Sequence, residues 1–113
     1  MKNFKNKVAA ITGAGSGIGQ QLAVLLAKQG CHLSLSDVNA QGLAQTVELL
    51  EKSNVRVTTQ KLDVADRDAM KLWAADTVQH HGSVNMIFNN AGVALGSTVE
   101  GASYEELEWI VNI

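Results

Sequence analysis

The sequence predicts an α/β fold, in which a parallel sheet carries helices on both faces in the doubly wound arrangement. Three observations predict it. Short apolar runs alternate with longer stretches of helical period, the elements run βαβαβαβ before a last helix, and no proline interrupts them. Helices between successive strands impose right-handed crossovers and parallel pairing. We expect the strand order 3-2-1-4, the first half of a doubly wound sheet.

The first strand and helix are expected on either side of a glycine-rich turn. Residues Lys7–Thr12 form a short apolar run closed by glycines, which is typical of a buried strand. Residues Gly17–Gln29 have the helical period, and Gly30 ends that helix. Four large apolar side chains at helical spacing mark the face typical of a core contact, namely Ile18, Leu22, Leu25 and Leu26.

The second strand is expected over His32–Asp37, and the helix after it has a ready cap. Asn39 precedes the helical period, and asparagine is among the residues preferred at a helix N-cap. This helix carries Leu43, Val47 and Leu50 on one face.

The remaining elements follow the same alternation. A third strand is expected over Val55–Leu62, and Asp66 caps a helix that reaches about His81, where Gly82 ends it. The fourth strand is expected over Val84–Asn89. A capping box, Ser103-x-x-Glu106, opens the last predicted helix.

Composition narrows the class of protein. The 113 residues make one domain at most, and nine basic against eleven acidic residues give no field that would attract nucleic acid or an anionic membrane. The apolar run after Lys2, Lys5 and Lys7 is too short for a signal peptide or a membrane span. The single cysteine, Cys31, fits a reducing cytoplasm and is expected to be a buried small hydrophobe. No Cys or His spacing predicts a metal site.

The glycine-rich turn is the first candidate for binding. It lacks the G-x-G-x-x-G spacing and instead has G-x-x-x-G-x-G through Gly13, Gly17 and Gly19. Between a strand and a helix, such a turn suits a dinucleotide pyrophosphate, because Gly13 allows a tight exit, Gly17 allows close approach of backbone, and Gly19 brings the helix near the sheet. A purely structural turn is the alternative. The Walker pattern is absent, which argues against an ATPase.

Asp37 is the second candidate. It ends the second strand, 18 residues after Gly19, where an acid accepts hydrogen bonds from adenosine ribose hydroxyls and repels a 2′-phosphate. Its neighbours in sequence, Ser36 and Val38, supply no cation for that phosphate, and neither does Ser16 in the turn. NAD(H) is therefore expected over NADP(H). The alternative is that Asp37 only caps the next helix.

These features, with Asp63-Val64, Asn89-Asn90-Ala91-Gly92 and Asn112, resemble the short-chain dehydrogenase/reductase family over essentially the whole chain. The resemblance implies a Rossmann-type NAD(P)-binding domain over residues 1–113. It implies a pyrophosphate site lined by Gly13, Ser16, Gly17, Ile18 and Gly19, with Asp37 holding the adenosine ribose. Adenine would be contacted by Asp63 and Val64, and the cofactor would be passed by Asn90, Ala91 and Gly92. Asn112 would take part in a catalytic proton relay. Asp63 as a plain strand-end acid and Asn112 as an ordinary helical residue are the alternatives.

One departure from the family pattern concerns the proton donor. The family uses a serine and a Tyr-x-x-x-Lys pair, but the only tyrosine here is Tyr104, with Glu108 four residues on. The three histidines are expected in packing or solvent contact: His32, His80 and His81. The domain is thus expected to be incomplete at its C-terminal end and inactive alone.

The sequence as a whole favours the N-terminal cofactor-binding half of an NAD-dependent oxidoreductase. Its reaction would be hydride transfer between a nicotinamide and a secondary alcohol or ketone, and the full-length protein would be a cytoplasmic homo-oligomer. A non-catalytic dinucleotide-binding or sensor module and an inactive truncation are the alternatives.

Overall fold

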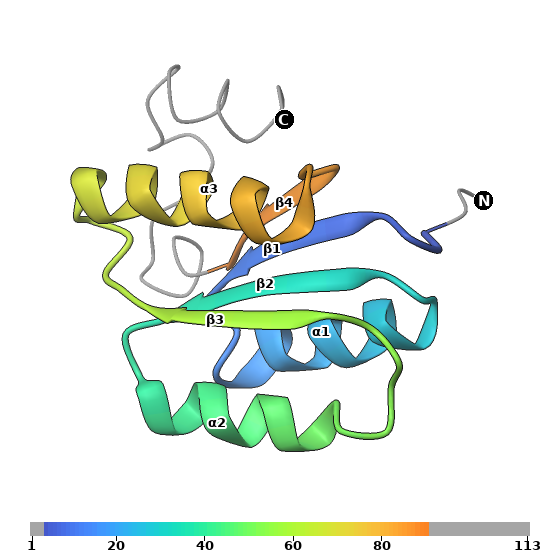
Figure 1. Ribbon diagram of the computed structural model, residues 1–113. Helices are drawn as coiled ribbons and strands as arrows, with labels where there is room; N and C mark the ends of the chain where they lie inside the picture. The colour runs from blue at the N-terminus through green and yellow to red at the C-terminus, as the bar shows by residue number, and fades with distance from the viewer. Residues whose placement is uncertain (1–3, 91–113) are drawn as a thin grey trace.

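A computed structural model describes residues 4–90, which form a four-stranded parallel sheet with helices on both faces (Figure 1). The elements in chain order are β1 (Val8–Thr12), α1 (Gly17–Lys28), β2 (His32–Asp37), α2 (Ala40–Leu49), β3 (Val57–Lys61), α3 (Arg67–His81) and β4 (Met86–Asn89). The sheet order is β3-β2-β1-β4. The predicted fold class and strand order are both confirmed. The helix predicted from Ser103 lies outside the described residues.

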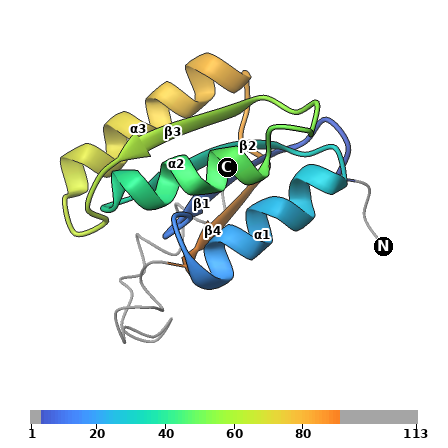
Figure 2. The same ribbon diagram turned by 90° about the horizontal axis from the view of Figure 1, so that it is seen from below.

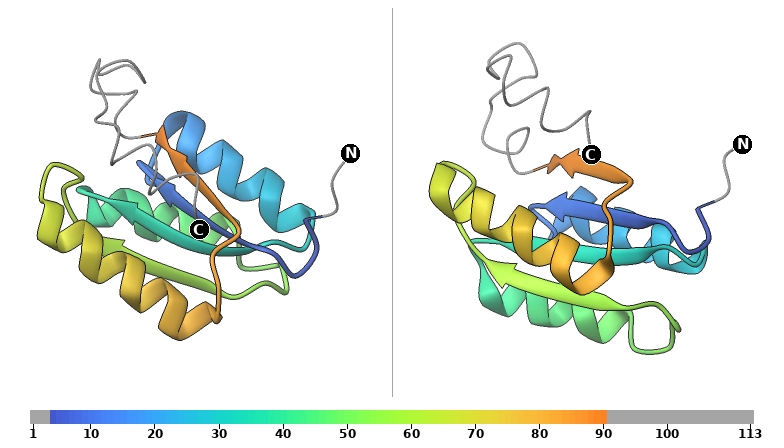
Figure 3. Two further views of the ribbon diagram at one scale, coloured as in Figure 1. Left: turned by 90° about the horizontal axis from the view of Figure 1, so that it is seen from above. Right: turned by 45° about the horizontal axis from the view of Figure 1, so that its top comes forward.

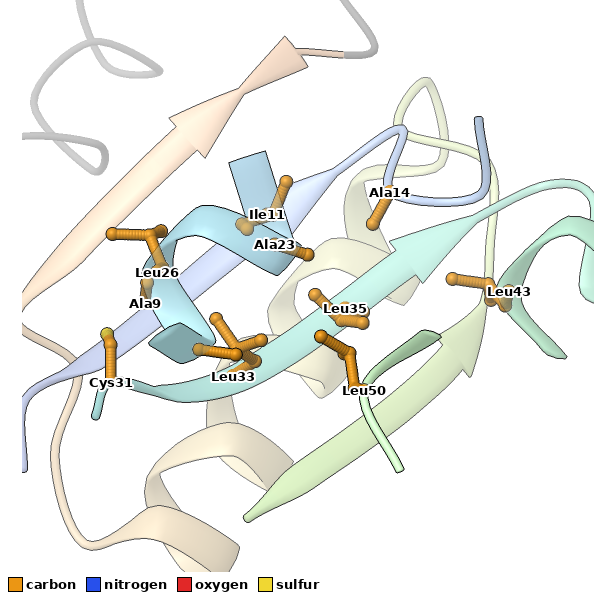
Figure 4. Close-up of a cluster of buried hydrophobic side chains, with 11 residues drawn as sticks. Ala9, Ile11, Ala14, Ala23, Leu26, Cys31, Leu33, Leu35, Leu43 and Leu50 are labelled. Carbon is orange, nitrogen blue, oxygen red and sulfur yellow. The ribbon is translucent and has the colours of Figure 1, made fainter. Parts of the chain in front are cut away.

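Helices α1 and α2 lie on one face of the sheet and α3 lies on the other, as the view from below shows (Figure 2). Successive side chains of a strand point to opposite faces. In β1 and β2, one set of alternating residues joins the hydrophobic core under α1 and α2 (Figure 4). Its buried strand residues are Ala9, Ile11, Leu33 and Leu35.

The face toward α3 is built differently. A small apolar cluster around Trp73 includes Ala10 of β1, but buried hydroxyls lie beside it. Ser34 Oγ and Thr77 Oγ1 are 2.6 Å apart, and Thr58 Oγ1 is 2.9 Å from His81 Nε2. Figure 3 shows α3 alone above this face within the described part of the chain. The buried side chains of β1 and β2 that point toward α1 and α2 are thus apolar, whereas the packing of α3 on the other face depends in part on hydrogen bonds to the strands.

The predicted helix signals are confirmed where they act locally. Asn39 Oδ1 accepts a hydrogen bond from Gly42 N at 3.0 Å, and Asp66 Oδ1 accepts one from Ala69 N at 3.0 Å. Gly82 takes the left-handed conformation (φ 83°) after α3. Each of these groups satisfies backbone atoms that a helix end leaves without partners.

The predicted helix faces are wrong in part. Ile18 and Leu25 are 72% and 60% exposed, although the apolar spacing of α1 placed them on its core face. The face that packs against the sheet consists of smaller residues, together with Leu26: Gly19, Ala23 and Ala27. Small side chains let the helix lie close to the strands, which turns the bulky residues outward. In α2, Val47 is likewise 37% exposed, while Thr46 is buried.

Three strands are shorter than predicted. β1 covers Val8–Thr12 within the predicted Lys7–Thr12. β3 covers Val57–Lys61 within the predicted Val55–Leu62, and β4 starts at Met86 and not at Val84. Asn85 explains the later start of β4, because its side-chain Oδ1 accepts from Val8 N at 2.8 Å while its own N donates to Val8 O. This residue thus caps β1 before regular pairing begins.

Candidate functional site

The site lies where the parallel strands end, because the turn after β1 and the starts of α1, α2 and α3 gather at that edge of the sheet (Figure 1). The switch point of a doubly wound sheet lies between β1 and β4, since the chain leaves β1 toward β2 on one side and reaches β4 on the other. Ligand crevices of such sheets form outside the carboxyl ends of the strands at this point.

The glycine turn has a shape that side chains would disturb. Gly13 and Gly17 have φ values of 65° and 55°, a region that residues with a Cβ rarely adopt. Gly19 is required for a different reason. A Cβ on Gly19 would collide with the Gly13 carbonyl group, because it would lie 2.8 Å from the Gly13 carbonyl carbon. It would also lie 2.9 Å from Asn90 Nδ2. The prediction that Gly13 allows a tight exit and Gly19 a close helix approach is consistent with these values.

The start of α1 is open. Its N-cap, Ser16, is extended and makes no side-chain cap hydrogen bond, and no acidic residue stands in the first turn. Ser16, Gly17 and Ile18 are all exposed. The first amide groups of a helix have no partner within it and carry the positive end of the helix dipole. The arrangement therefore offers free N–H donors and partial positive charge to an anion.

The Asp37 carboxylate lies beside this turn. Its Oδ2 accepts from Gly15 N at 2.8 Å and its Oδ1 accepts from Asn39 N at 3.0 Å. Asn39, and not Asp37, is the N-cap of α2, so the alternative role predicted for Asp37 as that helix's cap is wrong. The half-buried carboxylate is held at one edge of the open helix start. Each oxygen keeps acceptor capacity for a further hydrogen bond.

A lysine stands beside Asp37 on the neighbouring strand. Lys61 of β3 stands opposite Asp37 in the register of β2 and β3, so the two residues are strand neighbours although 24 positions separate them. Lys61 was not predicted as a neighbour of Asp37, because it is neither adjacent to Asp37 in the sequence nor part of the glycine turn. Pairing of strands is the signal that finds it.

The ends of β3 and β4 reach the same place. Leu62 N donates to Asp37 O at 3.1 Å, which brings Asp63 next to the end of β2. Asp63 is exposed, and its Oδ1 accepts from Ala65 N at 2.9 Å, while Val64 packs against the cluster around Trp73. On the other side of β1, Asn90 Nδ2 donates to Gly13 O at 3.2 Å.

Three predicted site residues cannot be placed. Ala91, Gly92 and Asn112 lie outside the described residues, as do Tyr104 and Glu108. The remaining predicted positions all belong to one edge of the sheet: the turn from Gly13 to Gly19, Asp37, Asp63, Val64 and Asn90.

Residues of α2 that support the glycine turn were not predicted from the sequence. Gly15 and Gly42 are in backbone contact, and Thr46 Oγ1 donates to Ala14 O at 2.7 Å. One signal for this was present, because Gly42 stands in the first turn of a helix, where glycine is unfavourable unless something approaches closely.

The cysteine and histidines show no catalytic arrangement in residues 4–90. Burial raises the pKa of the Cys31 thiol to about 11, so Cys31 is a hydrophobic core residue, as predicted. Burial, followed by the charge of Arg56, lowers the pKa of both His32 and His81. His81 packs against Thr58, and His80 Nδ1 lies 2.8 Å from Asp76 O at the end of α3.

Two kinds of feature are absent from the described part of the chain. No three His, Cys, Asp or Glu side chains of residues 4–90 gather closely enough to hold a metal ion. None of the helices α1 to α3 combines the length and hydropathy that a membrane crossing requires.

Comparison with known proteins agrees with this geometry. The family model described as short chain dehydrogenase matches residues 7–113. The oxidoreductase SadH of Mycobacterium tuberculosis is 42% identical over 113 residues, and cyclohexanol dehydrogenase of Acinetobacter sp. (strain SE19) is 39% identical over 90 residues. The match covers all of this chain and 41% of SadH, and it covers 80% of this chain and 36% of the cyclohexanol dehydrogenase.

A solved structure is similar over almost the whole chain. The short chain dehydrogenase from Mycobacterium paratuberculosis, bound to NAD, has a TM-score of 0.77 and 27% identity, covering 96% of this chain and 45% of that one. The chain thus spans less than half the length of the relatives it matches. From the family model and the shared architecture, the chain belongs to the short-chain dehydrogenase family.

Proposed function

We propose that this chain binds NAD(H) and forms the N-terminal, cofactor-binding part of an oxidoreductase. Its reaction is hydride transfer between a nicotinamide and a secondary alcohol or ketone, and the nicotinamide supplies that chemistry when bound. One observation carries the proposal. The uncapped start of α1 lies beside a carboxylate, Asp37, that the glycine turn itself holds.

The start of α1 fits a pyrophosphate. The amides of Gly17, Ile18 and Gly19 are the first of the helix, so they have no acceptor within it. A cap or an acid in the first turn would occupy or repel the same position, and α1 has neither. The helix therefore supplies N–H donors to the two phosphates, and its own first turn adds no negative charge beside them.

Asp37 fits the adenosine ribose and favours NAD(H) over NADP(H). The carboxylate can accept hydrogen bonds from the ribose hydroxyls, whereas a 2′-phosphate would place a second anion against it. Lys61, its neighbour across the sheet, partly offsets that repulsion. We therefore expect a preference of about tenfold, or about 1.4 kcal/mol, and not complete exclusion of NADP(H).

The other strand ends complete the proposed cofactor site. Asp63 and Val64 would contact adenine, a role supported by the hydrogen bond that brings Leu62 to Asp37. Asn90, followed by Ala91 and Gly92, would run past the cofactor, a role supported by the bond between Asn90 and the Gly13 carbonyl. Asn112 is proposed as the catalytic residue of this part of the protein.

The substrate class is proposed from the relatives. One of them is named for the oxidation of cyclohexanol, and the similar structure from Mycobacterium paratuberculosis holds NAD. A small alcohol or ketone is the corresponding substrate here, in a cytoplasmic protein that works as a homo-oligomer at its full length.

Titration of the full-length natural protein with NADH and NADPH tests the proposal. NADH should bind about tenfold more tightly. The Asp37→Ala variant should bring the two dissociation constants together, because the repulsion is gone and Lys61 remains. Absence of NADH binding to a folded wild type would overturn the proposal. Formation of NADH from NAD and a secondary alcohol separates the enzyme from a non-catalytic sensor, which would bind the dinucleotide without turnover.

A further inference from the structure

The glycine turn rests on α2 as well as on β1 and α1. Gly15 and Gly42 are so close that a Cβ on Gly42 would lie 2.6 Å from Gly15 O, and a Cβ on Gly15 would lie 3.1 Å from Gly42 C. Gly15 is buried. Contact of backbone against backbone leaves the turn no room to move toward α2.

A fully buried hydroxyl fixes the same place. Thr46 of α2 is 0% exposed, and its Oγ1 donates to Ala14 O at 2.7 Å, with Gly42 O also near at 3.1 Å. The same oxygen accepts from Gln20 Nε2 at 2.9 Å. Thr46 thus joins the turn, α1 and α2 through one atom.

The carbonyl that Thr46 holds belongs to the peptide that holds Asp37. Ala14 O and Gly15 N are the two ends of one planar peptide unit, so fixing the direction of the carbonyl fixes the direction of the N–H. That N–H donates to Asp37 Oδ2 at 2.8 Å. A rotation of the peptide away from Thr46 would carry the N–H away from the carboxylate.

We propose that Thr46 is a positioning residue that sets the place of the Asp37 carboxylate through the Ala14–Gly15 peptide, and thereby sets discrimination between NADH and NADPH. The proposal rests on the proposed function for its cofactor. Its structural half, the coupling of Thr46 to Asp37, stands on hydrogen bonds within the chain and is measured separately below.

The test compares Thr46→Val, which has the same shape without the hydroxyl, with Thr46→Ser, which keeps the hydroxyl, in the full-length protein. Thr46→Val should weaken NADH binding about tenfold and reduce the NADH preference over NADPH to about twofold or less. Thr46→Ser should restore both. Reduced nicotinamide mononucleotide, which lacks the adenosine half, should bind all three proteins alike.

A matched control separates positioning from loss of stability. Thr77 of α3 is also a buried threonine, with its hydroxyl 2.6 Å from Ser34 Oγ, and it lies on the opposite face of the sheet. Thr77→Val should lower the midpoint of thermal unfolding about as much as Thr46→Val does, yet leave the NADH-to-NADPH ratio of dissociation constants unchanged. An equal change of that ratio in both variants would overturn the proposal.

Amide hydrogen exchange at Gly15, followed by NMR, reads the coupling without any cofactor. Exchange should be faster in Thr46→Val than in wild type and Thr46→Ser. If wild type binds no NADH, the proposed function fails, while the exchange rate at Gly15 still tests whether Thr46 is coupled to Asp37. An unchanged exchange rate at Gly15 in Thr46→Val would overturn that coupling. Should Thr46→Val not fold, Gly15→Ala displaces the carboxylate directly, since its Cβ would lie 2.9 Å from Asp37 Oδ2, and it should reproduce the loss of NADH preference.

Discussion

Helices α1 and α3 begin at the same edge of the sheet, each after a parallel strand, but their first turns differ in charge and in hydrogen bonding. α3 has its own cap, because Asp66 accepts from Ala69 N, and Asp68 adds a negative charge to the first turn. α1 has Ser16 at the cap without a side-chain bond, and no acid in the first turn. The first-turn amides, which lack partners within a helix, are thus capped by a side chain in α3 and left open in α1.

The difference shows how a fold separates stability from binding. A side-chain cap contributes about 1 kcal/mol to the stability of a helix. α1 lacks this contribution, because Ser16 makes no side-chain cap hydrogen bond. In exchange the amides of its first turn stay accessible, whereas in α3 Ala69 N is bound to the Asp66 carboxylate and Asp68 adds a second negative charge. Of these two helices, α1 is therefore the one suited to an anionic ligand.

The largest expected effect comes from Gly19→Ala, which closes the open helix start by steric means. The new Cβ would meet the Gly13 carbonyl and Asn90 Nδ2, so the turn has to move. NADH binding should fall by about a hundredfold or more, and the free energy of unfolding should fall by about 1–3 kcal/mol, as for other overpacked sites. NADH titration and urea unfolding of the full-length protein measure the two quantities.

Gly82→Ala at the end of α3 is the matched control. Gly82 has a φ of 83° but no atom within 4 Å of an added Cβ, so alanine there is strained without a steric contact. It should cost about 1–2 kcal/mol of stability and leave NADH binding unchanged. Equal losses of binding in the two variants would remove the distinction between the two helices.

Ser16→Asp should convert α1 into a helix of the α3 type. The carboxylate can cap the first turn and interact with the dipole, so the free energy of unfolding should rise by about 0.5–1 kcal/mol. NADH should bind about tenfold more weakly, because the same charge repels the phosphates. Ser16→Asn supplies a cap without the charge and should weaken binding less. Unchanged NADH affinity in Ser16→Asp would show that phosphates do not bind at this helix start.

Asp66→Ala makes the reverse change in α3. Loss of the cap should lower the free energy of unfolding by about 1 kcal/mol, while the NADH dissociation constant stays within about twofold of wild type. Asp66→Asn keeps an acceptor and should recover most of the stability. A clear loss of NADH affinity in Asp66→Ala would place α3 in the binding site and contradict the comparison.

The caps could be predicted from the sequence because they are local. Asn39, Asp66 and Gly82 act on atoms within four residues, so residue type and spacing contain the needed information. The sheet order also followed from the sequence, since short strands joined by helices allow few topologies. The local chemistry of Gly13 and Gly19 was predictable on the same ground.

Contacts between elements that are distant in the sequence could not be predicted in the same way. Hydropathy ranks Ile18 and Leu25 above Ala23, but the sheet surface selects the smaller residue because it permits close packing. The position of Lys61 opposite Asp37 depends on strand register. The hydrogen bond from Thr46 to the Ala14 carbonyl joins residues 32 positions apart, and neither residue type by itself indicates such a contact. What the sequence leaves open here is which distant atoms meet.

The smallest expected effect is a pH dependence of stability that belongs to the far end of α3 and not to the binding site. Burial lowers the pKa of His81, and the charges of Arg56, His32 and His80 lower it further. His81 Nδ1 is buried with no hydrogen-bond partner in the described part of the chain, so a proton there finds no acceptor. The folded protein therefore takes up this proton less readily than the unfolded chain, whose histidine pKa is about 6.5.

The sign of the dependence follows from that difference. Above about pH 6.5 His81 is neutral in both states and its contribution to stability is complete, and this contribution is lost as the pH falls from there toward the lower pKa of the folded state. The free energy of unfolding in urea should fall between pH 7.5 and pH 5.5, and it should fall less in His81→Gln than in wild type. Some dependence should persist, since burial also lowers the pKa of His32. His80→Gln, at an exposed position one residue away, should keep most of the fall. If His81→Gln and His80→Gln show the same dependence as wild type, the buried end of α3 is not its origin, and the contrast between the two helices is limited to their first turns.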